Sequence, residues 1–155
     1  MGRLSVATSS WTLNGRPVPF VPFRLDFDCI ERHGFPLGLY LGSLQDKHAV
    51  ARASIRVERI TGPILLISGT DDAIWPSGAM CERVVERLKQ CDFAASVQHL
   101  SYDGAGHLRA GPSSSAPPRA IGAGGFALGG TEATSAAARD DAWQKVLTFL
   151  GKYLR

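Results

Sequence analysis

The stretch Ile64-Leu-Leu-Ile-Ser-Gly-Thr-Asp-Asp72 decides the fold that this sequence predicts. After the Gly62-Pro63 break, an apolar run at Ile64–Ser68 leads to a glycine, which is typical of a strand buried on both faces in a parallel sheet. A helix should begin near Ser77, because apolar residues then recur at helical spacing: Met80, Cys81, Val84, Val85 and Leu88.

Further along the chain, a second strand is predicted at Ser96–Ser101, and an amphipathic helix from about Ala133 to Leu154. The order strand, helix, strand, helix points to right-handed parallel crossovers. The expected fold class is therefore α/β, a mostly parallel sheet flanked by helices. Residues 109–130 are rich in Gly, Pro, Ser and Ala and nearly uncharged, so we expect a long loop there.

The N-terminal part of the chain predicts less regular structure. Residues 1–23 lack periodicity, and the three prolines between Pro17 and Pro22 favour an extended segment. Residues 24–42 have the glycines and proline of a loop. Ser43 stands where a helix N-cap is expected, which predicts a short helix to about residue 53.

Composition is that of an ordinary globular protein. The chain has 155 residues, enough for one domain, with 45% apolar residues, 20% charged residues and a net charge of +3. Basic residues are interleaved with acidic ones, and no apolar run approaches the roughly 20 residues of a membrane span, so we expect neither nucleic-acid nor membrane binding. Cys29, Cys81 and Cys91 follow no Cys-x-x-Cys spacing, which favours reduced thiols in a cytoplasmic protein.

Two residues at the predicted strand ends suggest catalysis. Asp72 lies four residues beyond the first strand and His107 six beyond the second, so both should reach the same rim of the sheet. A carboxylate there can hold the imidazole through Nδ1 and leave Nε2 free to take a proton from a nucleophile. Asp71 and Asp103 compete for the acid role. The plainer alternatives are that Asp72 caps the following helix or makes a turn, and that His107 is a loop histidine.

The motifs also resemble a known family. Gly62-Pro-Ile-Leu-Leu-Ile-Ser-Gly-Thr-Asp-Asp-Ala-Ile-Trp-Pro-Ser77, Tyr102-Asp-Gly-Ala-Gly-His107, Phe126-Ala-Leu-Gly-Gly-Thr131 and Asp141-Ala-Trp143 look like the C-terminal part of the acyl-CoA thioesterase / bile acid-CoA:amino acid N-acyltransferase family. The segment from Trp11 to Phe20 is similar too. The resemblance implies an α/β-hydrolase fold acting on fatty acyl-CoA thioesters. It also implies Asp72 as the acid, His107 as the base and Trp75 in the wall of the site. No metal or redox cofactor is expected.

The sequence departs from that family in one respect. No Gly-x-Ser-x-Gly or Gly-x-Cys-x-Gly motif occurs in these 155 residues. Ser43 lacks both glycines at the spacing that a nucleophile turn requires, and Cys81 lies on an apolar helix face. His33, His48 and His99 are isolated, with no metal-ligand spacing. The expectation is therefore a partial α/β-hydrolase domain over residues 1–155 that lacks the nucleophile-bearing half and is inactive alone.

Two alternatives stay open at this point. The chain could be a non-catalytic module on a hydrolase scaffold, self-associating through an exposed sheet edge. It could also derive from an ester, lactone or dienelactone hydrolase, since an Asp–His pair serves those enzymes equally well.

Overall fold

The computed structural model describes residues 5–6, 9–107, 111 and 125–154. The chain divides at Arg56 into two compact units, residues 1–56 and 57–155, and each is described by itself. The sequence-predicted α/β elements all lie in the second unit.

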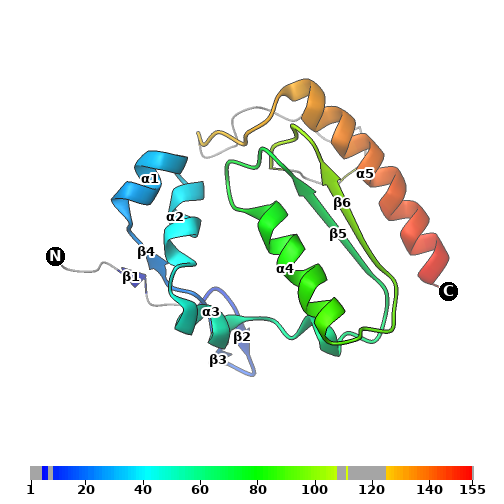
Figure 1. Cartoon of the computed structure of the whole chain (residues 1–155), viewed down its shortest axis with the longest axis horizontal. Coiled ribbons are helices and arrows are strands. Elements are labelled where there is room, and N and C mark those ends of the chain that lie inside the picture. Colours follow the sequence, from blue (N-terminus) through cyan, green and yellow to red (C-terminus); the bar gives the residue numbers. More distant parts are fainter. Residues whose placement is uncertain (1–4, 7–8, 108–110, 112–124, 155) are drawn as a thin grey trace. The chain divides into compact units, whose positions relative to one another are not determined.

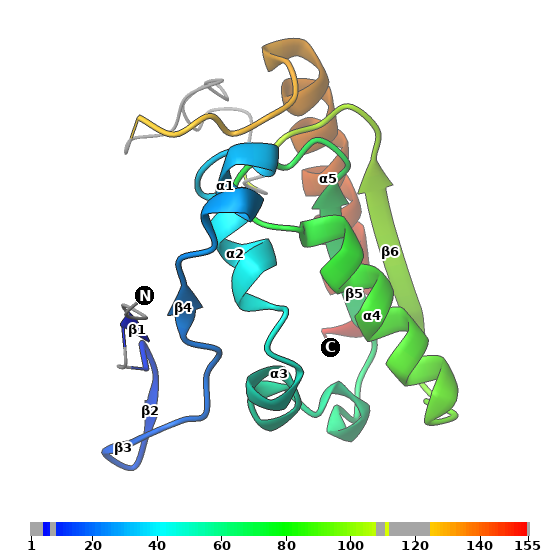
Figure 2. The same ribbon diagram turned by 60° about the vertical axis from the view of Figure 1, so that its left-hand side comes forward.

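The second unit is built on the predicted pair of strands, β5 (Ile64–Gly69) and β6 (Val97–Tyr102). They are parallel, with Ile64 opposite Val97 and Gly69 opposite Tyr102. Helix α4 (Ser77–Gln90) connects them, and α5 (Glu132–Tyr153) follows β6. Figures 1 and 2 show α4 on one face of the strand pair and α5 on the other. The predicted α/β order is therefore confirmed.

Helix α4 uses the apolar face that the sequence predicts. Leu88 on this face is buried. An ion pair also joins α4 to the short 3-10 turn Val57–Arg59: the Arg87 guanidinium donates two hydrogen bonds to the Glu58 carboxylate, at 2.6 and 2.9 Å. Helix α5 begins at a capping box, since the Thr131 hydroxyl accepts from the Thr134 N–H and the Thr134 hydroxyl from the Thr131 N–H.

The strand β5 is less enclosed than its sequence suggests. Ser68 and Gly69 are buried, but Ile64–Ile67 are only half-buried. Within the described residues β5 has a strand neighbour on one edge only. Helices therefore cover the faces of the strand pair, but no second strand flanks the apolar side chains of β5 at its other edge. The apolar stripe of α5 is likewise open toward its end: Leu147, Leu150 and Leu154 are 45%, 39% and 72% exposed.

The first unit contains more helix than the sequence predicts. The prediction of a loop at residues 24–42 is wrong. Helices α1 (Phe27–His33) and α2 (Leu37–Ser43) occupy most of this stretch, and α3 (Lys47–Ala53) follows. Tight packing explains the glycines, because a Cβ at Gly38 would lie 2.5 Å from the Cys29 carbonyl oxygen of α1. Gly38 therefore lets two short helices touch, rather than marking a loop.

Short strands complete this unit. Strands β2 (Thr12–Leu13) and β3 (Arg16–Pro17) form a hairpin turned by Asn14 and Gly15, both with positive φ. Strand β1 (Ser5–Val6) pairs with β4 (Phe23–Arg24). The segment between β3 and β4 has no helix, as its prolines predict.

The predicted N-cap role of Ser43 is wrong. Ser43 is the last residue of α2, where its hydroxyl donates to the Leu39 carbonyl at 2.7 Å and accepts the Arg24 N–H at 2.9 Å. The N-cap of α3 is Asp46, whose carboxylate accepts the Ala49 N–H. A buried serine can satisfy its own helix and a neighbouring strand at once, and sequence spacing does not reveal that second partner.

We expect Ser43→Ala to lower the free energy of unfolding by about 1–2 kcal/mol, because the Arg24 N–H loses its acceptor. Ser54→Ala is the matched control, since Ser54 donates to the Val50 carbonyl in the same way but is exposed. Urea unfolding of both variants checks this; equal losses would mean that the contact with Arg24 contributes nothing.

Most of the loop predicted at residues 109–130 lies outside the described residues. Of that stretch, residues 111 and 125–130 are described. Among the helices described, none has the length and apolarity that a bilayer crossing requires.

Candidate active site

Asp72 sits in the tight turn that follows β5. It is 7% exposed, and its Oδ1 accepts the backbone N–H groups of Ile74 at 2.9 Å and Trp75 at 3.2 Å. These bonds fix the carboxylate at the carboxyl end of the strand, before α4 begins. Asp72 therefore has the turn-forming role of the plainer alternative and not the helix-capping one, since the N-cap of α4 is Pro76; that role leaves its second oxygen available.

His107 is held by backbone contacts from a distant segment. Its N–H donates to the Leu128 carbonyl at 2.7 Å, and that oxygen also accepts the Ala73 N–H at 3.3 Å. One residue therefore ties the histidine loop to the aspartate turn. Close approach requires glycine: a Cβ at Gly106 would overlap the Gly129 carbonyl, and a Cβ at Gly129 would overlap that of Asp71.

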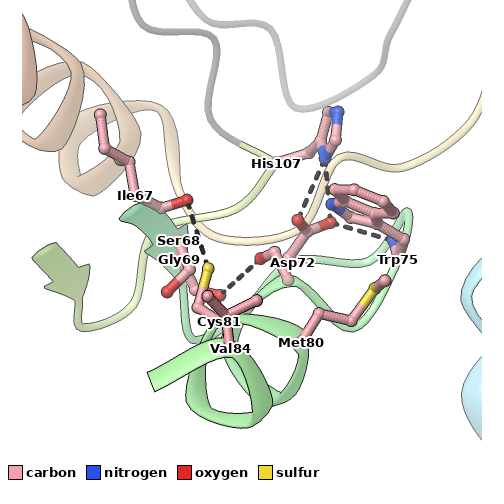
Figure 3. A pocket seen from close by; sticks show the side chains of 10 residues that line it. Ile67, Ser68, Gly69, Asp72, Trp75, Met80, Cys81, Val84 and His107 are labelled. Atoms are coloured by element: carbon pink, nitrogen blue, oxygen red, sulfur yellow. Dashed lines mark hydrogen bonds and ion pairs between the residues drawn. The ribbon is translucent and has the colours of Figure 1, made fainter. Parts of the chain in front are cut away.

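The two side chains meet. Nδ1 of His107 lies 3.0 Å from Oδ2 of Asp72 and 3.2 Å from Oδ1, and Figure 3 shows the other ring nitrogen pointing away from the carboxylate. Within the described part of the chain, Nε2 has no hydrogen-bond partner. The geometry thus matches an imidazole oriented by a carboxylate, with its second nitrogen available for a proton.

The other candidate acids lie apart from the imidazole. Asp71 and Asp103 are exposed, and each accepts a long hydrogen bond from the Thr70 hydroxyl, at 3.3 and 3.4 Å. The structure therefore brings Asp72 to His107 and leaves its two competitors on the surface.

Hydrogen bonding decides the charge of Asp72. Burial by itself raises the pKa of this carboxyl, but donors from His107, the Ile74 N–H, the Ser77 hydroxyl and the Trp75 N–H outweigh it and lower the pKa below its usual range. Asp72 is consequently ionised at neutral pH, which is the state that stabilises a protonated imidazole.

A cavity of about 300 Å³ opens beside the pair. It is lined mainly by apolar side chains of β5 and α4, and Trp75 and His107 line it too (Figure 3). Trp75 thus borders the site, as the family resemblance implies. The sequence predicted Ser77 only as the start of a helix and gave it no role in the site, but Ser77 also lines the cavity and its hydroxyl bonds to Asp72.

Cys81 lines the same cavity as a neutral thiol. Burial raises its pKa, and the nearby Glu82 carboxylate acts in the same direction against a hydrogen bond with Ser68. A thiol held protonated is a poor nucleophile. Its position on the half-buried face of α4 agrees with the packing role that the sequence predicts.

The remaining histidines lie elsewhere. His99 on β6 pairs with the buried Ser68 hydroxyl through Nε2 at 2.8 Å, while His33 and His48 are exposed on α1 and α3. Across the described ranges, no three His, Cys, Asp or Glu side chains gather as metal ligands.

A buried carboxylate bonded to an imidazole, at the carboxyl ends of neighbouring parallel strands, is the acid–base arrangement of α/β proteins of the hydrolase class. Comparison with known proteins narrows that class. The family model described as BAAT / Acyl-CoA thioester hydrolase C terminal matches residues 5–155, and the chain belongs to this family. The family that the sequence motifs predict for this chain is therefore confirmed.

One curated relative is the peroxisomal succinyl-coenzyme A thioesterase of Mus musculus. It is 33% identical over 103 residues, which cover 64% of this chain and 24% of that protein. The chain thus aligns with about a quarter of the relative's length.

Proposed function

We propose that this chain carries the acid, Asp72, and the general base, His107, of an acyl-CoA thioester hydrolase. The observation that supports it best is the 3.0 Å contact between Nδ1 and Oδ2, with Nε2 turned away from the carboxylate. Family membership supplies the substrate class, a thioester of coenzyme A. The chain then corresponds to the C-terminal part of an α/β-hydrolase domain spanning residues 1–155, with Asp72 and His107 as two members of a triad.

The proposed chemistry follows from these two groups. Nε2 of His107 takes the proton of a serine or cysteine nucleophile, whose oxygen or sulfur attacks the thioester carbonyl carbon. The carbon–sulfur bond breaks, and the coenzyme A sulfur leaves with that proton as a thiol. Water then attacks the acyl-enzyme through the same base and releases the carboxylic acid. Asp72 stabilises the imidazolium in both steps.

We infer that the nucleophile lies outside these 155 residues. The sequence has no nucleophile turn, and the serines and cysteine beside the cavity have other roles: Ser68 pairs with His99, Ser77 reaches Asp72, and Cys81 is a neutral thiol. A site that has the acid and the base but no nucleophile cannot form the acyl-enzyme.

The chain alone should therefore release coenzyme A from palmitoyl-CoA or succinyl-CoA no faster than buffer does. A thiol-reactive dye measures the released coenzyme A, and a chain carrying His107→Ala is the control. Turnover at enzymatic rates that disappears in His107→Ala would place a nucleophile within these residues and contradict the inference.

The second candidate function is a non-catalytic module that self-associates. The half-buried apolar strand Ile64–Ile67 and the exposed leucines of α5 favour it. Sedimentation of the purified chain separates the candidates: a stable dimer supports self-association, and a monomer at high concentration counts against it.

The compartment stays a prediction. The three free cysteines agree with a reducing compartment such as the cytoplasm. The name of the mouse relative places that protein in the peroxisome.

A further inference from the structure

The loop that carries His107 is bound by the first turn of α5. Figures 1 and 2 show α5 beginning at the end of the strand pair where β5 and β6 finish. In that turn, the Thr134 hydroxyl donates to the Gly104 carbonyl at 2.6 Å, and the Ser135 hydroxyl accepts the Gly106 N–H at 3.2 Å. Two successive residues of one helix therefore bind the loop at two points, and the second point lies next to the histidine.

The contact between Ser135 and the loop is enclosed. Ser135 is 8% exposed, and its hydrogen bond with the Gly106 N–H is buried. Without the serine hydroxyl, that buried N–H would lack an acceptor, and only movement of the loop could return it to water. Gly104 and Gly106 would offer little resistance to such a movement, because glycine has the widest choice of backbone angles. The position of this loop therefore depends on contacts from outside it.

Movement of the loop would change the contact between the acid and the base. The Ala105 carbonyl, between the two glycines, accepts the Asp71 N–H at 3.0 Å, so the histidine loop and the aspartate turn share a backbone hydrogen bond. Nδ1 of His107 lies 3.0 Å from Oδ2 of Asp72. An additional separation of about 0.6 Å would take these two atoms beyond hydrogen-bond distance. A small displacement of the loop is therefore enough to release the imidazole.

We propose that Ser135 is a positioning residue for His107. Its hydroxyl holds the Gly106 N–H and thereby keeps the imidazole in the tautomer in which Nδ1–H faces Asp72 and Nε2 is free to take a proton. Ser135 acts through the backbone of the loop, since its hydroxyl bonds to Gly106 and not to either side chain of the acid–base pair. The inference rests on the proposed function, because it concerns the base of that same site.

The tautomer of His107 can be measured on the chain alone, without any catalytic activity. The nitrogen-15 chemical shifts of the imidazole distinguish the Nδ1–H form from the Nε2–H form at a pH that keeps the ring neutral. In the wild-type chain the Nδ1–H form should dominate. In Ser135→Ala the ratio of Nδ1–H to Nε2–H should fall about 10-fold, because a hydrogen bond to a charged carboxylate has that effect on an equilibrium. An unchanged ratio would overturn the proposal.

Ser43→Ala is the matched control. Ser43 is also a buried serine whose hydroxyl accepts one backbone N–H, that of Arg24, but it belongs to the first unit. Its replacement should leave the tautomer ratio of His107 unchanged, and an equal fall in both variants would mean that general loss of stability is the cause. Ser135→Thr retains the hydroxyl and should keep the wild-type ratio. A fall in Ser135→Thr as large as in Ser135→Ala would assign the effect to packing and would also overturn the proposal.

Amide hydrogen exchange on the wild-type chain tests the same contact and does not depend on whether a variant folds. The Gly106 amide, bonded to Ser135, should exchange at least about 10-fold more slowly than the Asp103 amide, which is exposed and has no acceptor among the described residues. Equal exchange of the two amides would show that Ser135 does not hold the loop and would overturn the proposal.

The same spectra separate this inference from the proposed function. A wild-type chain whose imidazole lacks the Nδ1–H form would contradict the pairing of Asp72 with His107, and with it both proposals. An Nδ1–H form that is present in the wild type and survives Ser135→Ala would overturn only the role of Ser135.

Discussion

Gly129→Ala should destabilise the second unit by about 2–5 kcal/mol. Gly129 has φ 79°, a left-handed backbone that costs an alanine about 1–2 kcal/mol. Its Cβ would also overlap the Asp71 carbonyl and lie 2.9 Å from the Ala73 nitrogen, an overpacking that costs about 1–3 kcal/mol more. Urea unfolding of the purified chain measures the loss.

Gly125→Ala separates these two costs. Gly125 has a similar φ of 75°, but its Cβ would meet no atom of the described residues within 4 Å. Gly125→Ala should therefore lower the free energy of unfolding only by the cost of the left-handed backbone, about 1–2 kcal/mol. If Gly125→Ala and Gly129→Ala lowered the free energy of unfolding by the same amount, close packing of residues 126–131 against the Asp72 turn would contribute nothing to stability.

Asp72→Asn should cost about 2–3 kcal/mol at neutral pH, because a buried, ionised acceptor of several hydrogen bonds is replaced by a neutral amide. Asp71→Asn is the matched control, since its carboxylate is exposed one residue away; its effect should stay within about 0.5 kcal/mol. Unfolding of both variants in urea at pH 7 measures the difference.

The effect of Asp72→Asn should also depend on pH. Hydrogen bonds hold the folded-state pKa of Asp72 below its ordinary value of 3.8, so the native state binds this proton less readily than the unfolded chain does. Its stabilisation is fully present above pH 3.8 and is lost as the pH falls through the folded-state pKa. The gap between wild type and Asp72→Asn should accordingly narrow in acid; a constant gap would assign the loss to packing rather than charge.

The second unit was predictable because its signals are local. The apolar run before Gly69 predicts a buried strand, and the 3.6-residue spacing from Met80 to Leu88 predicts the helix after it. The strands and helices there begin and end within a residue or two of their predicted bounds. The first unit was less predictable, because α1 and α2 are short and contain glycines that serve packing between helices.

The sequence by itself determined the α/β order, the family and the pair of chemical groups at the strand ends, because these depend on residue type and spacing along the chain. Spacing along the chain left Asp71, Asp72 and Asp103 as competing acids, and only the family resemblance favoured Asp72. The tertiary structure shows which carboxylate lies against His107, since this depends on how the Leu128 carbonyl and the turn at Ile74 and Trp75 hold the two loops. The tertiary structure also shows that, among the described residues, β5 has a strand neighbour on one edge only, because pairing between strands depends on contacts between distant parts of the chain.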